Sequence, residues 1–209
     1  MIKIYNMNLL TQNTKIKETG NYLKKKVFNF SIPAYRSETG KVTCPFADKC
    51  IKFCYAQKGN YKRFPSVRNG MEKKYQLTKQ SNFIELMNKE IIKKKPDFIR
   101  VHDSGDYYSP KYLNKWLTIA KDNPKVKFYS YTNSIKFIKD LKKLPKNFDF
   151  IFSDSGKQVN LIDTKKDRHT KIFNSIESLN KLGYKNASKI DLFATKWFNP
   201  TNKVGLIFH

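Results

Sequence analysis

Three cysteines lie close together near the start of the chain, in a segment that has the character of a binding loop. Cys44, Cys50 and Cys54 are the only cysteines among the 209 residues, and their spacing is C-x5-C-x3-C. Thiolates bind soft metal centres, and a short loop can wrap three of them around one centre. Pro45, Asp48 and nearby lysines make the segment polar, which argues against three free cysteines buried in a core. The segment therefore predicts a metal centre.

The number of cysteines favours an iron–sulfur cluster over zinc. Structural zinc takes four ligands, usually from paired C-x2-C knuckles, and this chain has neither a knuckle nor a fourth cysteine. A [4Fe–4S] cluster on three thiolates leaves one iron open to a small molecule or to an oxygen or nitrogen side chain. We expect such a cluster on Cys44, Cys50 and Cys54. The alternative is a zinc site that His102 completes.

Further polar residues follow three apolar runs of the chain, at the point where each run ends. In a parallel sheet these positions meet at the carboxyl edge of the strands, where α/β proteins build their sites. Any one of them could be an ordinary turn residue. Beside the cysteines, the set together predicts residues that bind a cofactor or a substrate. The set consists of His102, Asp103, Ser104, Gly105, Asp106, Tyr131, Thr132, Ser153 and Asp154.

The apolar pattern of the chain alternates between strands and helices. The predicted strands span residues 27–32, 98–101, 126–131, 148–152, 190–194 and 204–208. The predicted helices span residues 66–94 with a break near 81, 110–120, 135–141 and 167–182. Strands joined by crossover helices predict an α/β fold with a mostly parallel sheet, either doubly wound or a partial barrel.

The length of the chain limits how much of a barrel it can form. A complete eight-stranded (β/α) barrel needs about 250 residues. With 209 residues, we expect a partial (β/α) barrel of five to six strands. Residues 1–26 are polar and lysine-rich, and we expect an N-terminal arm or lead-in there. Residues 27–209 then form a single α/β iron–sulfur domain.

The chain is strongly basic, with 42 Lys and Arg against 17 Asp and Glu and a net charge of +25. Such a charge attracts polyanions. Only five of the basic residues are arginine, the residue best suited to bidentate reading of bases. The composition therefore favours nonspecific nucleic-acid binding over sequence-specific recognition, although AT-rich codons would also enrich lysine. No run approaches the roughly 20 apolar residues of a membrane span, and clustered thiols suit a cytoplasmic protein.

Two motifs carry a resemblance to a known family. Residues 43–56 read Thr-Cys-Pro-x-Ala-x-x-Cys-x-x-x-Cys-Tyr-Ala, and residues 100–109 read Arg-x-His-Asp-Ser-Gly-Asp-x-Tyr-Ser. Together with residues 30–34, 128–132 and 153–156, they resemble the gene-product-88-like family of tailed bacteriophages. The resemblance covers nearly the whole chain after residue 8. It implies a viral protein that acts in the cytoplasm of the host cell.

A looser resemblance is to radical S-adenosylmethionine enzymes. These enzymes also place three cysteines after the first strand of a partial barrel, and Cys54-Tyr55-Ala56 is similar to the end of their cluster motif. Ser104-Gly105-Asp106 stands where those enzymes contact the methionine amine with Gly-Gly-Glu. Their usual spacing, C-x3-C-x2-C, differs from the spacing here. This resemblance implies S-adenosylmethionine as a second cofactor.

Three functions stay open on the sequence alone. The first is an iron–sulfur enzyme of the radical S-adenosylmethionine type, acting on an unidentified substrate. The second is a non-enzymatic iron–sulfur protein with a redox or regulatory role, which binds a host protein or nucleic acid. The third is a zinc-stabilised binding module. The sequence does not decide whether the protein is an enzyme.

Overall fold

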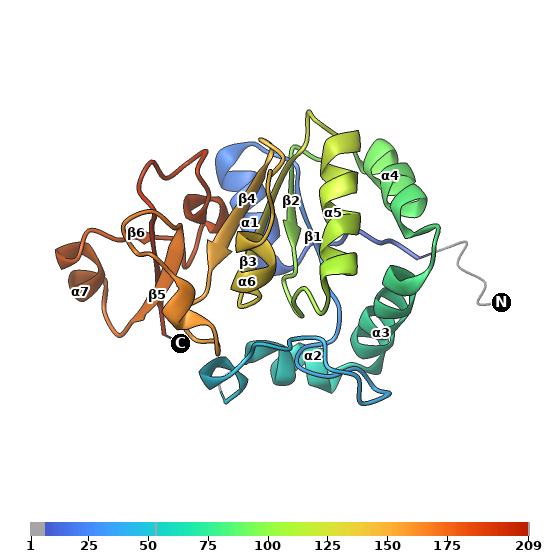
Figure 1. Ribbon diagram of the computed structural model, residues 1–209, viewed down its shortest axis with the longest axis horizontal. Coiled ribbons are helices and arrows are strands. Elements are labelled where there is room, and N and C mark those ends of the chain that lie inside the picture. Colours follow the sequence, from blue (N-terminus) through green and yellow to red (C-terminus); the bar gives the residue numbers. More distant parts are fainter. Residues whose placement is uncertain (1–6, 53, 209) are drawn as a thin grey trace.

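The computed structural model of the chain describes residues 7–52 and 54–208, and its centre is a parallel sheet (Figure 1). The sheet has seven strands in the order β1-β2-β3-β4-β5-β7-β6. Every neighbouring pair in it is parallel. The strands are β1 (Val27–Phe30), β2 (Phe98–Val101), β3 (Lys127–Thr132), β4 (Phe148–Phe152), β5 (His169–Phe173), β6 (Lys185–Asn186) and β7 (Lys203–Ile207).

The strand order is that of a partial barrel. The first five strands lie side by side in chain order, so successive crossovers continue in one direction, without the reversal that marks a doubly wound sheet. The prediction of a partial (β/α) barrel is thus confirmed, with slightly more strands than the five to six expected. The helices are α1 (Thr14–Leu23), α2 (Gly59–Arg63), α3 (Pro65–Lys79), α4 (Phe83–Lys94), α5 (Pro110–Asp122), α6 (Ile135–Lys139) and α7 (Ile176–Lys181).

The outer face of the sheet packs against the crossover helices. Figure 1 shows α5 and α6 in front of the strands, with α4 beside α5. Trp116 of α5 and Phe83 of α4 are fully buried and contact Phe30 of β1, with ring centroids 5.1 and 5.8 Å from that of Phe30. Ser109 caps α5 by accepting a hydrogen bond from the Tyr112 amide at 3.2 Å. Pro110 follows it at the first helical position, so the Ser-Pro pair marks the start of the helix as the sequence predicts.

The inner face of the sheet is covered by the N-terminal helix and by a segment near the C-terminus. Helix α1 lies behind the strands in Figure 1. Its Ile16 packs with Val27 and Phe98 of the sheet and with Leu192 of a short 3-10 helix, η4 (Asp191–Ala194). Part of the segment predicted as an arm is therefore a helix that packs against the inner face of the barrel.

The prediction for the C-terminal third was wrong in two places. Residues 167–182 were expected to form one helix, but they form β5 and then α7, and Ser175 caps α7. Residues 190–194 were expected to form a strand and instead include η4. Strand β5 is stabilised by five register pairs with β7, and such non-local pairing overrides a local helical pattern.

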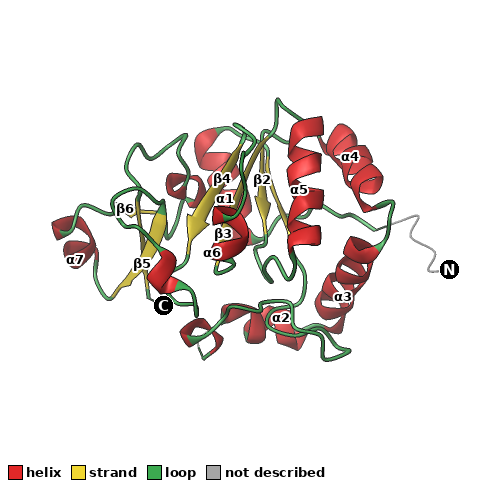
Figure 2. Ribbon diagram, in the orientation of Figure 1, coloured by secondary structure: helices red, strands yellow, loops and turns green. Residues whose placement is uncertain are grey.

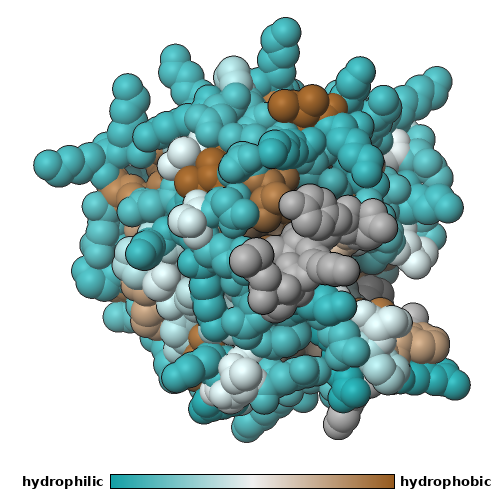
Figure 3. Space-filling model, turned by 90° about the vertical axis from the view of Figure 1, so that its right-hand side faces the viewer, coloured by the Kyte–Doolittle hydropathy of each residue, from teal (hydrophilic) through white to brown (hydrophobic). Residues whose placement is uncertain are grey.

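The face of the molecule drawn in Figure 3 is predominantly hydrophilic. Figure 3 shows the side of the molecule that carries α3 and α4, where hydrophilic side chains surround a few small apolar patches. Among residues 7–52 and 54–208, no helix has the length and apolar character needed to cross a membrane.

Candidate metal and cofactor site

The three cysteines line one cavity at the carboxyl edge of the sheet. The cavity has a volume of about 170 Å³. In Figure 2 the segment that carries the cysteines consists of loops and short helices below the strands. Most of the residues predicted to bind a cofactor line the same cavity. These are His102, Asp103, Ser104, Gly105, Asp106, Tyr131 and Ser153.

Hydrogen-bond donors point at two of the sulfur atoms. The backbone N–H of Tyr35 donates to Cys44 Sγ at 3.2 Å, and Asn133 Nδ2 lies 3.8 Å from Cys50 Sγ. Burial raises the pKa of the Cys44 and Cys54 thiols, and the Asp106 carboxylate raises that of Cys44 further. These thiols therefore stay protonated until a positive centre stabilises the thiolates.

The cysteine segment is attached to the loop that follows β4. Ala47 forms an antiparallel bridge with Gly156, and the Lys157 amide donates to the Phe46 carbonyl at 2.8 Å. A Cβ atom at Gly156 would lie 2.3 Å from Asn133 Oδ1 and 2.7 Å from the Phe46 carbonyl oxygen. Only glycine permits this approach of three segments.

Asp106 joins the loops that follow β2 and β3. Its carboxylate accepts hydrogen bonds from Thr132 Oγ1 at 2.6 Å, the Asn133 amide at 2.8 Å and the Tyr107 amide at 2.7 Å. Burial raises the pKa of Asp106 to about 6, although these hydrogen bonds oppose the shift. Thr132, predicted to contact a cofactor, instead supports Asp106 from behind the cavity.

Ser104 and Gly105 attach the same loop to the end of β1. The Ser104 hydroxyl donates to the Ile32 carbonyl at 2.9 Å, and the Ile32 amide donates to the Ser104 carbonyl at 3.1 Å. Gly105 has a φ of +85°, and a Cβ there would lie 2.2 Å from Ile32 Cγ1. Ser104 and Gly105 therefore hold the edge of the sheet together.

His102 is buried beside the cavity as a neutral imidazole. Its backbone has a φ of +65°, and its Nε2 lies 2.9 Å from the Tyr112 hydroxyl. Burial lowers the pKa of His102 to about 3, and the Arg100 charge adds to this shift. Its Nδ1 is buried without a hydrogen-bond partner among the described residues.

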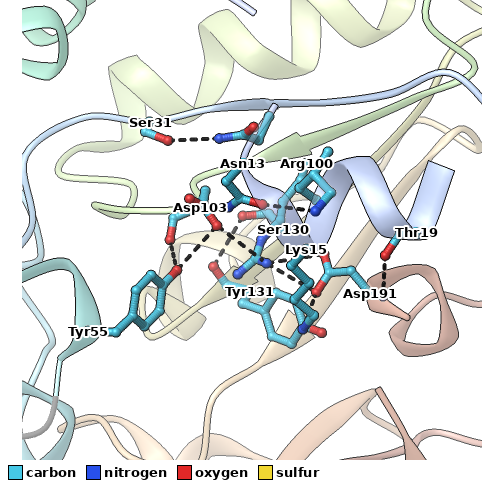
Figure 4. Close-up of polar contacts among 12 residues, drawn as sticks. Asn13, Lys15, Thr19, Ser31, Tyr55, Arg100, Asp103, Ser130, Tyr131 and Asp191 are labelled. Atoms are coloured by element: carbon cyan, nitrogen blue, oxygen red, sulfur yellow. Dashed lines mark hydrogen bonds and ion pairs between the residues drawn. The ribbon is translucent and has the colours of Figure 1, made fainter. Parts of the chain in front are cut away.

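Asp103 is the centre of a second group of polar side chains, which Figure 4 shows beside Arg100. The Tyr61 hydroxyl donates to the Asp103 carboxylate, and the Tyr55 hydroxyl donates to the Asp103 backbone carbonyl and lies 3.3 Å from the carboxylate. Arg100 Nη1 lies 3.5 Å from the same carboxylate. Burial of the hydroxyls and the Asp103 charge raise the pKa of both tyrosines, although Tyr55 as a whole residue is 53% exposed.

Arg100 extends this group into the inside of the barrel. Its Nη1 lies 3.1 Å from both carboxylate oxygens of Asp191, and Lys15 Nζ lies 2.8 Å from the same carboxylate (Figure 4). The Tyr129 hydroxyl donates to Asp191 at 2.7 Å, and the Arg100 guanidinium lies 4.8 Å from the ring centroid of Tyr131. Burial alone would raise the pKa of Asp191, but Arg100 and Lys15 outweigh it and lower the pKa to about 2.

Sequence reasoning missed part of this group. An arginine inside the short apolar strand β2 was an available signal, because a buried charge needs a partner. Asp191 gave no such signal, since it lies 91 positions from Arg100. Asp154, by contrast, was predicted at the site but turns toward Thr170 of β5, with 3.4 Å between Asp154 Oδ1 and Thr170 Oγ1.

The described residues contain no group of three His, Cys, Asp or Glu side chains arranged around the position of a single metal ion. The three cysteines nevertheless line one cavity, and hydrogen-bond donors point at two of their sulfur atoms.

The fold and the site define a class: a parallel α/β partial barrel with a cysteine-lined cavity at its carboxyl edge. The chain belongs to the Gene product 88 family, whose model matches residues 7–201. It is similar to the Gene 88 protein of Mycobacterium phage L5, with 31% identity over 102 residues, and to that of Mycobacterium phage D29, with 29%. Each alignment covers 43% of this chain and 42% of the relative. No solved structure matches the chain.

Proposed function

We propose that this phage-type protein is an iron–sulfur protein in which Cys44, Cys50 and Cys54 hold a [4Fe–4S] cluster. The observation that carries the proposal is the position of all three cysteines on one cavity at the carboxyl edge of the sheet. The Tyr35 amide and Asn133 Nδ2 supply hydrogen bonds to sulfur, which tune the potential of such clusters. A cluster would supply one-electron chemistry or an open iron at this edge.

The fourth iron position is proposed to be open to a small molecule. Both carboxylates that could close it already have partners inside the protein: Asp106 accepts three hydrogen bonds, and the Asp103 carboxylate accepts one from Tyr61. Recruiting either carboxylate would break these contacts. His102 Nδ1, which has no partner among the described residues, is the one protein atom that could replace the small molecule without such a loss.

The geometry favours a non-enzymatic redox or regulatory role. The cavity of about 170 Å³ is smaller than the roughly 300–1,000 Å³ of pockets that enclose drug-sized ligands. The inside of the barrel beyond it is occupied by Arg100, Asp191 and Lys15. A chemistry that needs only electron exchange at the edge of the sheet fits this space better than a bound S-adenosylmethionine and a substrate.

An enzyme of the radical S-adenosylmethionine type is the second candidate. The placement of the cysteine segment after the first strand of a partial barrel supports it. For either role we propose the cytoplasm of the infected host cell as the location, because a reducing compartment keeps the three free cysteines available for iron.

Single cysteine variants test the cluster. We expect the full-length protein, reconstituted anaerobically with iron and sulfide, to become brown, and Cys44→Ser, Cys50→Ser and Cys54→Ser each to lose most of the visible absorption. Ser178→Ala, on the distant helix α7, is the control and should match the wild type. Urea unfolding would show that each variant is folded. A folded Cys50→Ser variant with unchanged absorption contradicts the proposal, as does preferential uptake of zinc.

Addition of S-adenosylmethionine to the reconstituted protein separates the two roles. An enzyme of the radical type would change the spectrum of the cluster and release 5′-deoxyadenosine under reductant. The non-enzymatic role predicts neither change, together with reversible reduction of the cluster by one electron.

A further inference from the structure

A second hollow shares no lining residue with the cysteine cavity. It is an open groove of about 710 Å³ in the C-terminal part of the molecule. Its walls come from the starts of β5 and β7, the residues before β5 and the turn after α7. The register pairs His169, at the start of β5, with Phe152, at the end of β4. We call this hollow the lysine groove. It is lined by Thr164, Lys165, His169, Lys171, Leu182, Gly183, Tyr184, Thr201, Asn202 and Lys203.

The charge of the lysine groove is entirely positive. Lys165, Lys171 and Lys203 are exposed, and no acidic residue lines the groove. Within the described part of the chain, none of these three lysines forms an ion pair with an acidic residue. Of the neighbouring carboxylates, Asp154 lies near His169 and Lys171 without forming an ion pair with either, and two others are paired outside the groove. Asp163 lies 3.8 Å from Lys166, and Asp167 lies 2.7 Å from Lys139.

An aromatic ring and a hydrogen-bonded pair add to this positive surface. The Tyr184 hydroxyl lies 2.9 Å from His169 Nε2, and His169 Nδ1 lies 2.9 Å from the Asp167 carbonyl oxygen, which fixes the imidazole. Lys203 Nζ lies 5.6 Å from the ring centroid of Tyr184 and donates to the Leu182 carbonyl at 3.1 Å. The ring of Tyr184 is thus held in place inside the groove.

We propose that the lysine groove binds the phosphate backbone of single-stranded nucleic acid. A positive groove that includes an aromatic side chain is how proteins bind single strands without sequence preference. The groove contains lysine and no arginine, and lysine acts as a point charge on phosphate rather than as a bidentate reader of bases. The groove is therefore suited to binding that is independent of sequence, and none of its lining residues lines the cavity of the proposed metal site.

Charge-matched variants test the location of this binding. The probe is a fluorescently labelled single-stranded DNA of mixed sequence, titrated with the full-length protein and followed by anisotropy at several salt concentrations. The groove variant carries Lys165→Gln, Lys171→Gln and Lys203→Gln. The control carries Lys93→Gln, Lys121→Gln and Lys125→Gln, which lie in α4, at the end of α5 and in the turn after it, and which lower the net charge equally.

We expect the groove variant to bind at least tenfold more weakly than the wild type at 0.1 M salt, roughly as three lost phosphate contacts require. The magnitude of the slope of log affinity against log salt should fall by about 2, because each of the three lost phosphate contacts contributes about 0.7 to it. The control should stay within about twofold of the wild type. Equal weakening in both variants would overturn the proposal, since the lysine coat as a whole would then carry the binding. Absence of binding by the wild type would overturn it as well.

A pair of tyrosine variants and two competitors test the kind of ligand. Tyr184→Phe and Tyr184→Leu both lose the hydrogen bond to His169, but only Tyr184→Leu loses the ring. We expect about fivefold or greater weakening in Tyr184→Leu alone, from lost stacking. Equal affinity for the matching duplex would overturn single-strand binding. Displacement of the DNA by inorganic phosphate, but not by chloride at equal ionic strength, would identify a small-anion site and overturn the proposal.

Discussion

The two faces of the sheet use the same strands in different ways. On the outer face, alternate residues of β1 to β4 are aromatic or aliphatic and pack against α3 to α6. On the inner face, the residues in between include Arg100 and Asp149, which need partners from distant parts of the chain. Arg100 is paired with Asp191, and the Arg168 Nε lies 3.4 Å from Asp149.

The difference shows that the two faces contribute unequally to the free energy of folding. Apolar burial on the outer face stabilises the sheet without dependence on pH. A buried ion pair on the inner face contributes little net stability, because desolvation offsets its attraction, yet loss of one partner is costly. Residues near the cavity belong to this second, more sensitive face. Four predictions test the comparison.

The largest effect is expected on the outer face. Trp116→Ala removes a fully buried side chain that contacts Phe30 and Phe83, and it should lower the free energy of unfolding by about 3–5 kcal/mol. Ile92→Ala is the control, because Ile92 is 70% exposed, and should change it by less than about 0.5 kcal/mol. Urea unfolding measures both. Similar changes in the free energy of unfolding for the two variants would show that packing on the outer face is not the main source of stability.

The next effect is expected on the inner face. Arg100→Met keeps the length of the side chain but leaves Asp191 and Asp103 without its charge, and should cost about 3 kcal/mol. Lys136→Met breaks an exposed pair with Asp140 and should cost less than about 0.5 kcal/mol. If Arg100→Met is no more harmful than Lys136→Met in the same unfolding experiment, the inner network is not the buried system described above.

The carboxyl edge of the sheet should also make stability depend on pH, through His102, which is buried against Tyr107 and Tyr112. Burial lowers its folded pKa from 6.5 to about 3, so the unfolded chain takes up the proton first as the pH falls. The contribution of His102 to stability is complete above about pH 6.5 and decreases toward pH 3, by about 2.5 kcal/mol between pH 7 and pH 4.5. His102→Asn, which tolerates the left-handed backbone, should flatten this slope. Identical slopes for wild type and variant would exclude His102 as the cause.

The smallest effect is expected at the edge of the sheet. Gly156→Ala places a methyl group against Asn133 and the Phe46 carbonyl, and should cost about 2 kcal/mol while weakening metal uptake. Gly70→Ala, in α3 with no atom within 4 Å of the new Cβ, should gain about 0.5–1 kcal/mol. A gain in both variants, seen as higher melting temperatures, would show that the contact between the cysteine segment and the β4 loop is dispensable.

The outer face and the edge of the sheet could be predicted from the sequence. Strands β1 to β4 are short apolar runs, and their order along the chain places Cys44, Asp106, Tyr131 and Ser153 at one edge. Local pattern and parallel topology were sufficient there.

The inner face and the C-terminal third could not be predicted in the same way. The pairing of Arg100 with Asp191 and the packing of α1 join segments far apart in sequence, and single-sequence periodicity contains no information on such contacts. Strand β5 has exposed residues in its middle and depends on β7, so its residues resembled part of a helix. Asp154 was predicted at the site only because it follows the end of β4. Its contact with Thr170 of β5 could not be foreseen, since β5 was not predicted as a strand.

The metal content of the protein, purified without exposure to air, tests the central claim most directly. The account predicts iron and acid-labile sulfide in equal amounts, approaching one [4Fe–4S] cluster per chain, and their loss in Cys44→Ser, Cys50→Ser and Cys54→Ser. Zinc in place of iron, or folded protein that binds no metal after reconstitution, would contradict it.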